Sequence, residues 1–75
     1  MDVESARLIA AGLAIGLGAV GSAIGEGMIG AKAMEAIGRN PEVQGQITPL
    51  IFVTMAITES TAIYALVVSL IILFV

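Results

Sequence analysis

Two glutamates stand in parts of the chain that otherwise lack charge. Glu59 is the single charged residue of residues 43–75, and Glu26 follows the uncharged residues 8–25. An ionised carboxyl group inside lipid is costly, so such an acid is expected to carry a function. The alternatives are a protonated Glu59 that only donates a hydrogen bond between helices, and a Glu26 whose carboxyl group reaches the membrane interface.

Hydroxyl groups gather around Glu59, in the run Thr58-Glu59-Ser60-Thr61 followed by Tyr64. Carboxylate, hydroxyl and backbone carbonyl oxygens suit a hard cation, whereas a proton needs only Glu59 and a dry pocket. Glu59 and Ser60 point about 100° apart on a helix, so one helix cannot easily aim both at one ion. We therefore expect a second copy to complete the site. Alternatively, the Ser and Thr hydroxyls only bond back to their own backbone.

A turn near residues 39–42 would bring Glu26 and Glu59 to similar depths, within about a turn and a half of helix. Two carboxyl groups at that separation cannot both be ionised cheaply and should exchange protons as one unit. We hypothesise that Glu26 keeps its proton and that Glu59 exchanges the ion.

The composition requires an apolar environment around these groups. Of the 75 residues, 59% are hydrophobic and 12% are charged, and the chain has neither Cys nor His. A soluble domain this small usually needs disulfides or a metal to be stable, and both are missing here. The net charge of −3 argues against nucleic acid, which binds basic surfaces. The acidic start of the chain predicts no signal peptide.

Two long apolar stretches are each able to cross a hydrocarbon core of roughly 30 Å. Because lipid offers no hydrogen-bond partners to the backbone, both stretches should be helices. We predict an all-α membrane protein with one domain over residues 1–75, a transmembrane antiparallel hairpin. Its first helix covers about 4–38, its polar turn about 39–42 and its second helix about 43–74.

The polar turn carries the signals that separate the helices. Gly38 is a candidate C-cap, and Pro41 suits the first turn of the next helix. Pro49 lies inside the second helix or marks its start. Lys32 and Arg39 flank the turn, so the positive-inside rule favours a cytoplasmic turn.

Small residues form two stripes on the first helix at about 100° per residue. One stripe holds Gly12, Gly16, Ala19, Ala23, Gly27 and Gly30, and the other holds Ala10, Ala14, Gly18, Gly21 and Gly25. Small residues allow close helix packing in lipid, and two opposed stripes suit contacts with neighbours on both flanks that close into a ring. Alternatively, one stripe faces the chain's own second helix. The bulkier residues 66–75 are expected to face lipid.

Together these features resemble one known family, the c subunit or proteolipid of F-type ATP synthases, over nearly the whole chain. Its members carry an Arg-(Gln or Asn)-Pro turn and one membrane carboxylate in the second helix, matched here by Arg39-Asn40-Pro41 and Glu59. They also carry an alternating array of small residues in the first helix, matched here by Ala19, Gly21, Ala23, Gly25 and Gly27.

The resemblance implies a homo-oligomeric ring of identical hairpins in membrane lipid, turning against the a subunit of the stator, with the central stalk docked on Arg39, Asn40 and Pro41. Ion passage would drive rotation and ATP synthesis. The chain itself has no nucleotide-binding loop and is expected not to be an enzyme on its own. Its expected location is the bacterial plasma membrane. The expected ring-packing residues are Gly12, Gly16, Gly18, Ala19, Gly21, Ala23, Gly25 and Gly27.

A subset of that family carries Na⁺ rather than H⁺, and its signature maps onto this chain. The matching groups are the Ile57 carbonyl, the Glu59 carboxylate, the Ser60 hydroxyl, Thr61, and Tyr64, which would bond to Glu59. Where that subset often has Gln in the first helix, this chain has Glu26, as in two-carboxylate variants. The resemblance implies Na⁺ as the transported ion with H⁺ as competitor. A proton-only ring and a structural or pore-forming hairpin remain as alternatives.

Overall fold

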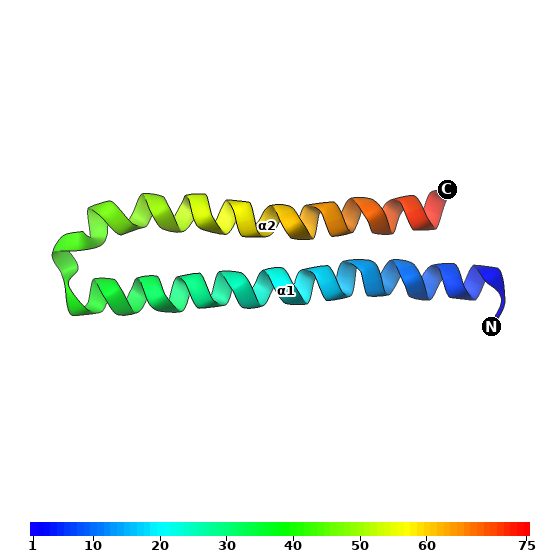
Figure 1. Ribbon diagram of the computed structural model, residues 1–75, viewed down its shortest axis with the longest axis horizontal. Helices are drawn as coiled ribbons and strands as arrows, with labels where there is room; N and C mark the ends of the chain where they lie inside the picture. The colour runs from blue at the N-terminus through cyan, green and yellow to red at the C-terminus, as the bar shows by residue number, and fades with distance from the viewer.

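A computed structural model describes all residues, 1–75, as two long helices joined by a short turn. Helix α1 spans Val3–Arg39, the 3₁₀ turn η1 spans Pro41–Val43, and helix α2 spans Gln44–Phe74. The helices lie antiparallel and side by side, so both termini are at the same end (Figure 1). This is the predicted all-α hairpin, and its length of 58 Å exceeds the roughly 30 Å of a hydrocarbon core.

The turn is built by Asn40 and Pro41 rather than by a glycine. Asn40 leaves the helical region, with φ −144° and ψ 87°, because a residue that precedes proline disfavours the helical conformation. Its side chain then accepts a hydrogen bond from the backbone N–H of Glu42 at 3.3 Å. Gly38 lies inside α1, and no glycine has a positive φ. The prediction of Gly38 as the C-cap is therefore wrong.

Pro41 opens η1, in the first-turn position that its sequence context predicts. Pro49 lies within α2, so it does not mark the start of that helix. A proline has no N–H to donate to the carbonyl one turn earlier, which removes one bond from the helical ladder there. The hydroxyl of Thr48 donates to the Gln44 carbonyl at 2.8 Å, so a side chain adds a bond in the same turn.

Only three residues of the hairpin are buried: Ala11, Ser22 and Ser69. They lie along the line where α1 meets α2, while the bulky Leu, Ile, Val, Met and Phe side chains are largely exposed. Both helices are long and apolar enough to cross a membrane. Of the 64 backbone hydrogen bonds, 60 lie within the helices, which leaves few backbone groups for lipid to satisfy. The outer surface of the hairpin therefore requires lipid or further copies around it.

Candidate functional site

The hairpin brings its two membrane carboxyl groups together. The carboxyl group of Glu26 in α1 lies beside that of Glu59 in α2, the arrangement that a turn at residues 39–42 predicts. Glu59 stands at the midpoint of α2, roughly 23 Å of helix from either end. Glu26 is half-buried and Glu59 is exposed on the single hairpin. Two adjacent carboxyl groups at mid-span need a proton or a cation between them to limit the charge.

Helix α1 contacts α2 directly beside these acids, at Thr58. The hydroxyl of Ser22 donates to the Thr58 carbonyl at 3.2 Å. Gly25 allows the close approach, because a Cβ atom at its position would lie 3.0 Å from Thr58 Cγ2. Ser22 lies three residues before Gly25 and four before Glu26, so it neighbours both of them on the surface of α1. This contact sets the height at which Glu59 meets Glu26.

Sequence reasoning missed Ser22, although a signal was present. Ser22 is the only hydroxyl-bearing residue between residues 6 and 39, and it lies one helical turn before Glu26. A lone hydroxyl on the same face as a membrane carboxyl group is the pattern that would have identified it. Its partner on α2 was not readable, because the rotation of one helix against the other is not encoded in either helix alone.

The remaining predicted ligands lie on α2 itself. The hydroxyl of Ser60 donates to the Ile57 carbonyl at 2.5 Å, so these two predicted ligand oxygens are adjacent and bonded to each other. Thr61 is exposed, and Tyr64 is 70% exposed. The bond from Tyr64 to Glu59 that the resemblance implies does not form within a single hairpin. No three acidic side chains converge, so a cation here would rest on two carboxyl groups and neutral oxygens.

The two stripes of small residues differ in what they contact. A Cβ atom at Gly18 would collide with the Cβ of Ala65, and Gly25 contacts Thr58. A Cβ atom at Gly12, Gly16 or Gly27 would meet nothing within 4 Å. We call the α1 residues against α2 the paired face; they are Ala11, Gly18, Ser22 and Gly25. We call the exposed stripe the open face; it comprises Gly12, Gly16, Ala19, Ala23 and Gly27.

The interpretation that both stripes serve neighbouring copies stays a prediction, and the single hairpin shows what one of the stripes contacts within its own chain. Gly18 and Gly25 pack against α2 of their own chain, which is the alternative that the sequence left open. Gly30, expected on the other stripe, also faces α2, since a Cβ atom there would lie 3.3 Å from Met55 Cε. A Cβ atom at Gly21 would meet nothing within 4 Å. The open face stays available, and its use by a neighbouring copy stays a prediction.

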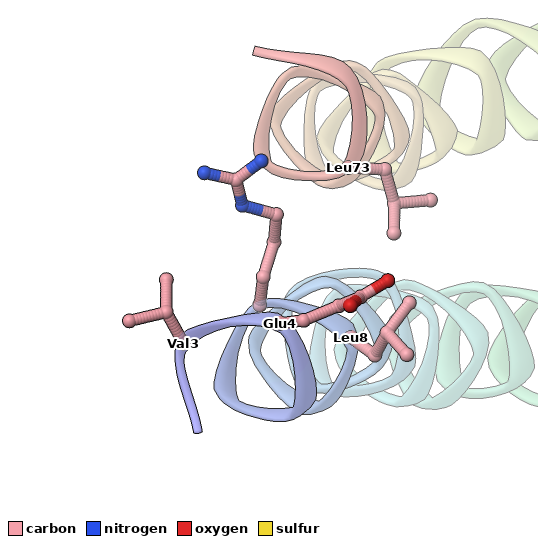
Figure 2. A pocket seen from close by; sticks show the side chains of 5 residues that line it. Val3, Glu4, Leu8 and Leu73 are labelled. Atoms are coloured by element: carbon pink, nitrogen blue, oxygen red, sulfur yellow. The ribbon is translucent and has the colours of Figure 1, made fainter.

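Both ends of the hairpin carry charged side chains that lie apart from the two acids. A hollow of about 400 Å³ at the terminal end is lined by Val3, Glu4, Arg7, Leu8 and Leu73. Figure 2 shows the Glu4 side chain between the two helix ends, near Leu8 and Leu73. Arg7 precedes Glu26 by roughly 28 Å of helix, so this hollow is not the site of the paired carboxyl groups.

At the turn end, the Arg39 guanidinium bonds to the Glu35 carboxylate at 2.7 Å, and Lys32 lies 3.8 Å from the same residue. The side chains of Lys32 and Arg39 are 83% and 78% exposed, so these ion pairs contribute little to stability. Their exposure leaves basic groups accessible beside Asn40 and Pro41.

Comparison with known proteins yields one family. The family model for the C subunit of ATP synthase matches residues 9–72. A Petrotoga mobilis protein, named as the c subunit of its ATP synthase, is 54% identical over 69 residues, covering 92% of this chain and 72% of the relative. A protein of the same name from Dehalococcoides mccartyi is 49% identical over 75 residues, covering 100% of this chain and 99% of the relative. A third, from Chloroflexus aurantiacus, is 43% identical over 72 residues, covering 96% and 95%.

Proposed function

The chain belongs to the family of ATP synthase C subunits, and we propose that it carries Na⁺, with H⁺ as competitor, on Glu59 assisted by Glu26. As a member of this family it is an integral membrane protein and a non-catalytic part of the membrane rotor of ATP synthase. The observation that carries the proposal is the meeting of the Glu26 and Glu59 carboxyl groups at mid-span. No other pair of acids lies within the apolar part of the chain.

The oxygens around Glu59 support a cation rather than protons alone. When Glu26 keeps its proton, one Na⁺ on the Glu59 carboxylate leaves the pair neutral, as a second proton also would, and a neutral pair is what a lipid-facing site requires. The Ser60 hydroxyl and the Ile57 carbonyl lie on the same turn of α2 and supply neutral oxygens. A hard cation takes this mixture of oxygen ligands, whereas a proton would use only one of them.

A neighbouring copy completes the site in this proposal. Glu59 is exposed on the single hairpin, and Glu26 lies between the paired face and the open face around α1. A copy that packs on the open face therefore covers the edge of α1 from which Glu26 projects. Thr61 and Tyr64, both exposed, are the side chains that such contacts would draw into the site.

The arrangement in the enzyme follows from the same proposal. Identical copies form a ring that turns against the a subunit of the stator, and the exposed turn at Arg39, Asn40 and Pro41 docks the central stalk. Lys32 and Arg39 place two basic residues at the turn, which favours a cytoplasmic turn in a bacterial plasma membrane.

Carbodiimide modification of Glu59 tests the choice of ion. The reagent attacks a protonated carboxyl group, so bound Na⁺ should protect Glu59 in the assembled ring at near-neutral pH, while the same concentration of K⁺ should not. The Glu26→Gln variant locates the modification, because labelling must persist when only Glu59 remains. Equal labelling in Na⁺ and K⁺ would reject Na⁺ as the transported ion.

A proton-only ring is the second candidate, and one contact favours it. The Ser60 hydroxyl already bonds to the Ile57 carbonyl, so both oxygens are engaged without an ion. In that case Ser60 and Tyr64 only order Glu59, and labelling depends on pH alone. Glu59→Gln should abolish ATP-driven ion transport under either candidate, and intact transport would contradict both.

A further inference from the structure

Ser22 differs from the other hydroxyl-bearing residues near the site in the direction of its hydrogen bond. Thr54, Thr58 and Ser60 all donate to carbonyls of their own helix, α2. Ser22 instead donates across to the Thr58 carbonyl, and the residue is only 4% exposed. A helical serine has a carbonyl of its own helix within reach one turn earlier. The bond to α2 therefore links the helices at one defined height.

Ser22 also lies beside the Glu26 carboxyl group. A serine hydroxyl has one hydrogen and two lone pairs, and the hydrogen is committed to the Thr58 carbonyl. Toward Glu26 the oxygen of Ser22 can then only accept. Ser22 thus contacts the backbone immediately before Glu59 on one side and the side chain of Glu26 on the other.

We propose that Ser22 is a positioning residue of the ion site, which holds the carboxyl groups of Glu26 and Glu59 at the separation that a cation needs. This inference rests on the proposed function, since it assigns a role to a residue outside the expected ligand set. Gly25 makes the contact possible by leaving room for Thr58, and Ser22 fixes it by a directed bond. Ser22 acts through the two acids and does not itself bind the ion.

The chain contains a matched control for this role. Ser69 is 5% exposed and donates across the same helix pair, to the Ala11 carbonyl at 2.8 Å. It lies ten residues from Glu59, roughly 15 Å along α2, and so cannot set the separation of the acids directly. Ser22→Ala and Ser69→Ala each remove one buried interhelical hydrogen bond, but only Ser22→Ala removes it at the acids.

The first measurement is the Na⁺ concentration that halves carbodiimide labelling of Glu59 in the assembled ring. We expect Ser22→Ala to raise this concentration by about three- to tenfold, the range for loss of one hydrogen bond in a membrane protein. Ser69→Ala should leave it unchanged. Equal shifts in the two variants, or no shift in Ser22→Ala, would overturn the positioning role. Ser22→Cys nearly preserves the side-chain volume and guards against a folding failure. If Ser22→Cys kept the wild-type Na⁺ concentration for half-labelling, the size of the side chain rather than its hydrogen bond would position the acids.

A second measurement does not depend on which ion is bound. Solid-state NMR of ring labelled with ¹³C-glutamate should give a contact between the carboxyl carbons of Glu26 and Glu59, identified by its loss in Glu26→Gln. We expect that contact to persist in Ser69→Ala and to weaken or vanish in Ser22→Ala. Absence of Na⁺ protection in the wild-type ring would reject the proposed ion alone, whereas an unchanged carboxyl contact in Ser22→Ala would reject the role of Ser22.

Discussion

The two faces of α1 carry the same kind of residue, but the residues have different surroundings. On the paired face, Gly18 lies so close to Ala65 that a methyl group has no room. On the open face, a methyl group at Gly16 meets nothing within the hairpin. Small residues thus indicate that a close approach is possible without indicating which helix approaches. Glu26 lies between the two faces, where the chain's own α2 and a neighbouring copy are both able to reach it.

The difference between the two faces is tested most strongly by placing a bulky side chain on the open face. Gly16→Leu should leave the hairpin folded but abolish the oligomer, because a bulky side chain blocks the close approach of a neighbouring helix in lipid. Native mass spectrometry of detergent-solubilised protein measures the oligomer, and circular dichroism measures the helix content. Gly45→Leu is the control, since Gly45 also has open space around it but lies on α2 near the turn. An intact oligomer in Gly16→Leu would show that the open face is not the contact between copies.

The paired face should respond in the opposite way. Gly18→Ala forces a methyl group against Ala65, and overpacking of this kind typically costs about 1–3 kcal/mol of unfolding free energy. Denaturation of the hairpin by titration with dodecyl sulfate measures this loss. Ala65→Gly should restore the space, so the double variant should be more stable than Gly18→Ala alone. Additive losses in the double variant would mean that these two residues do not meet.

Much of the fold was predictable because its determinants are local. The uncharged stretches are long enough to span lipid, and Asn40 followed by Pro41 stops one helix and starts the next. The same local logic placed Glu26 and Glu59 at one height. Gly38 was misread as the C-cap because glycine is the common terminator, whereas here the residue before a proline ends the helix.

The contacts between the helices were not predictable, because each joins residues far apart in the chain. Ser69 bonds to Ala11 across 58 residues of sequence, and Ser22 bonds to Thr58 across 36. These bonds and the Gly18–Ala65 contact set the rotation of α1, and that rotation decides which stripe is covered. A period of small residues in one helix contains no information about its partner's surface.

Removal of a single interhelical bond should have a smaller effect than overpacking the paired face. Ser69→Ala deletes the bond to the Ala11 carbonyl and should lower the unfolding free energy by about 0.6 kcal/mol, the average for such bonds in membrane proteins. Ser60→Ala is the control, because its hydroxyl bonds within its own helix and should contribute nothing to helix pairing. The dodecyl sulfate titration ranks the three variants. A loss in Ser69→Ala larger than that in Gly18→Ala would reverse the ranking of glycine and hydroxyl contacts on this face.

The smallest effect is expected at the start of α1, beyond the paired face and the open face. The Asp2 carboxylate accepts a hydrogen bond from the backbone N–H of Ser5 at 2.7 Å, and this bond lowers the pKa of Asp2 below its ordinary value. This bond makes Asp2 the N-cap of α1. The stabilisation by this N-cap is therefore fully present above the ordinary aspartate pKa, and it is lost as the pH falls through the lowered pKa. Because Asp2 is fully exposed, the loss should fray only the first turn.

The ¹⁵N–¹H resonance of Ser5 in detergent micelles reports this cap during an acid titration. Its midpoint should lie below that of an unperturbed aspartate, and Asp2→Asn should abolish the titration while keeping the cap, since Asn also accepts from the backbone. Glu4→Gln should leave the midpoint in place, because the Ser5 N–H bonds to Asp2 and not to Glu4. A midpoint at the ordinary aspartate value would contradict the cap. If the amide resonances near Ser22 shifted with the same midpoint as that of Ser5, the first turn of α1 would be coupled to the paired face. The two regions would then not be independent.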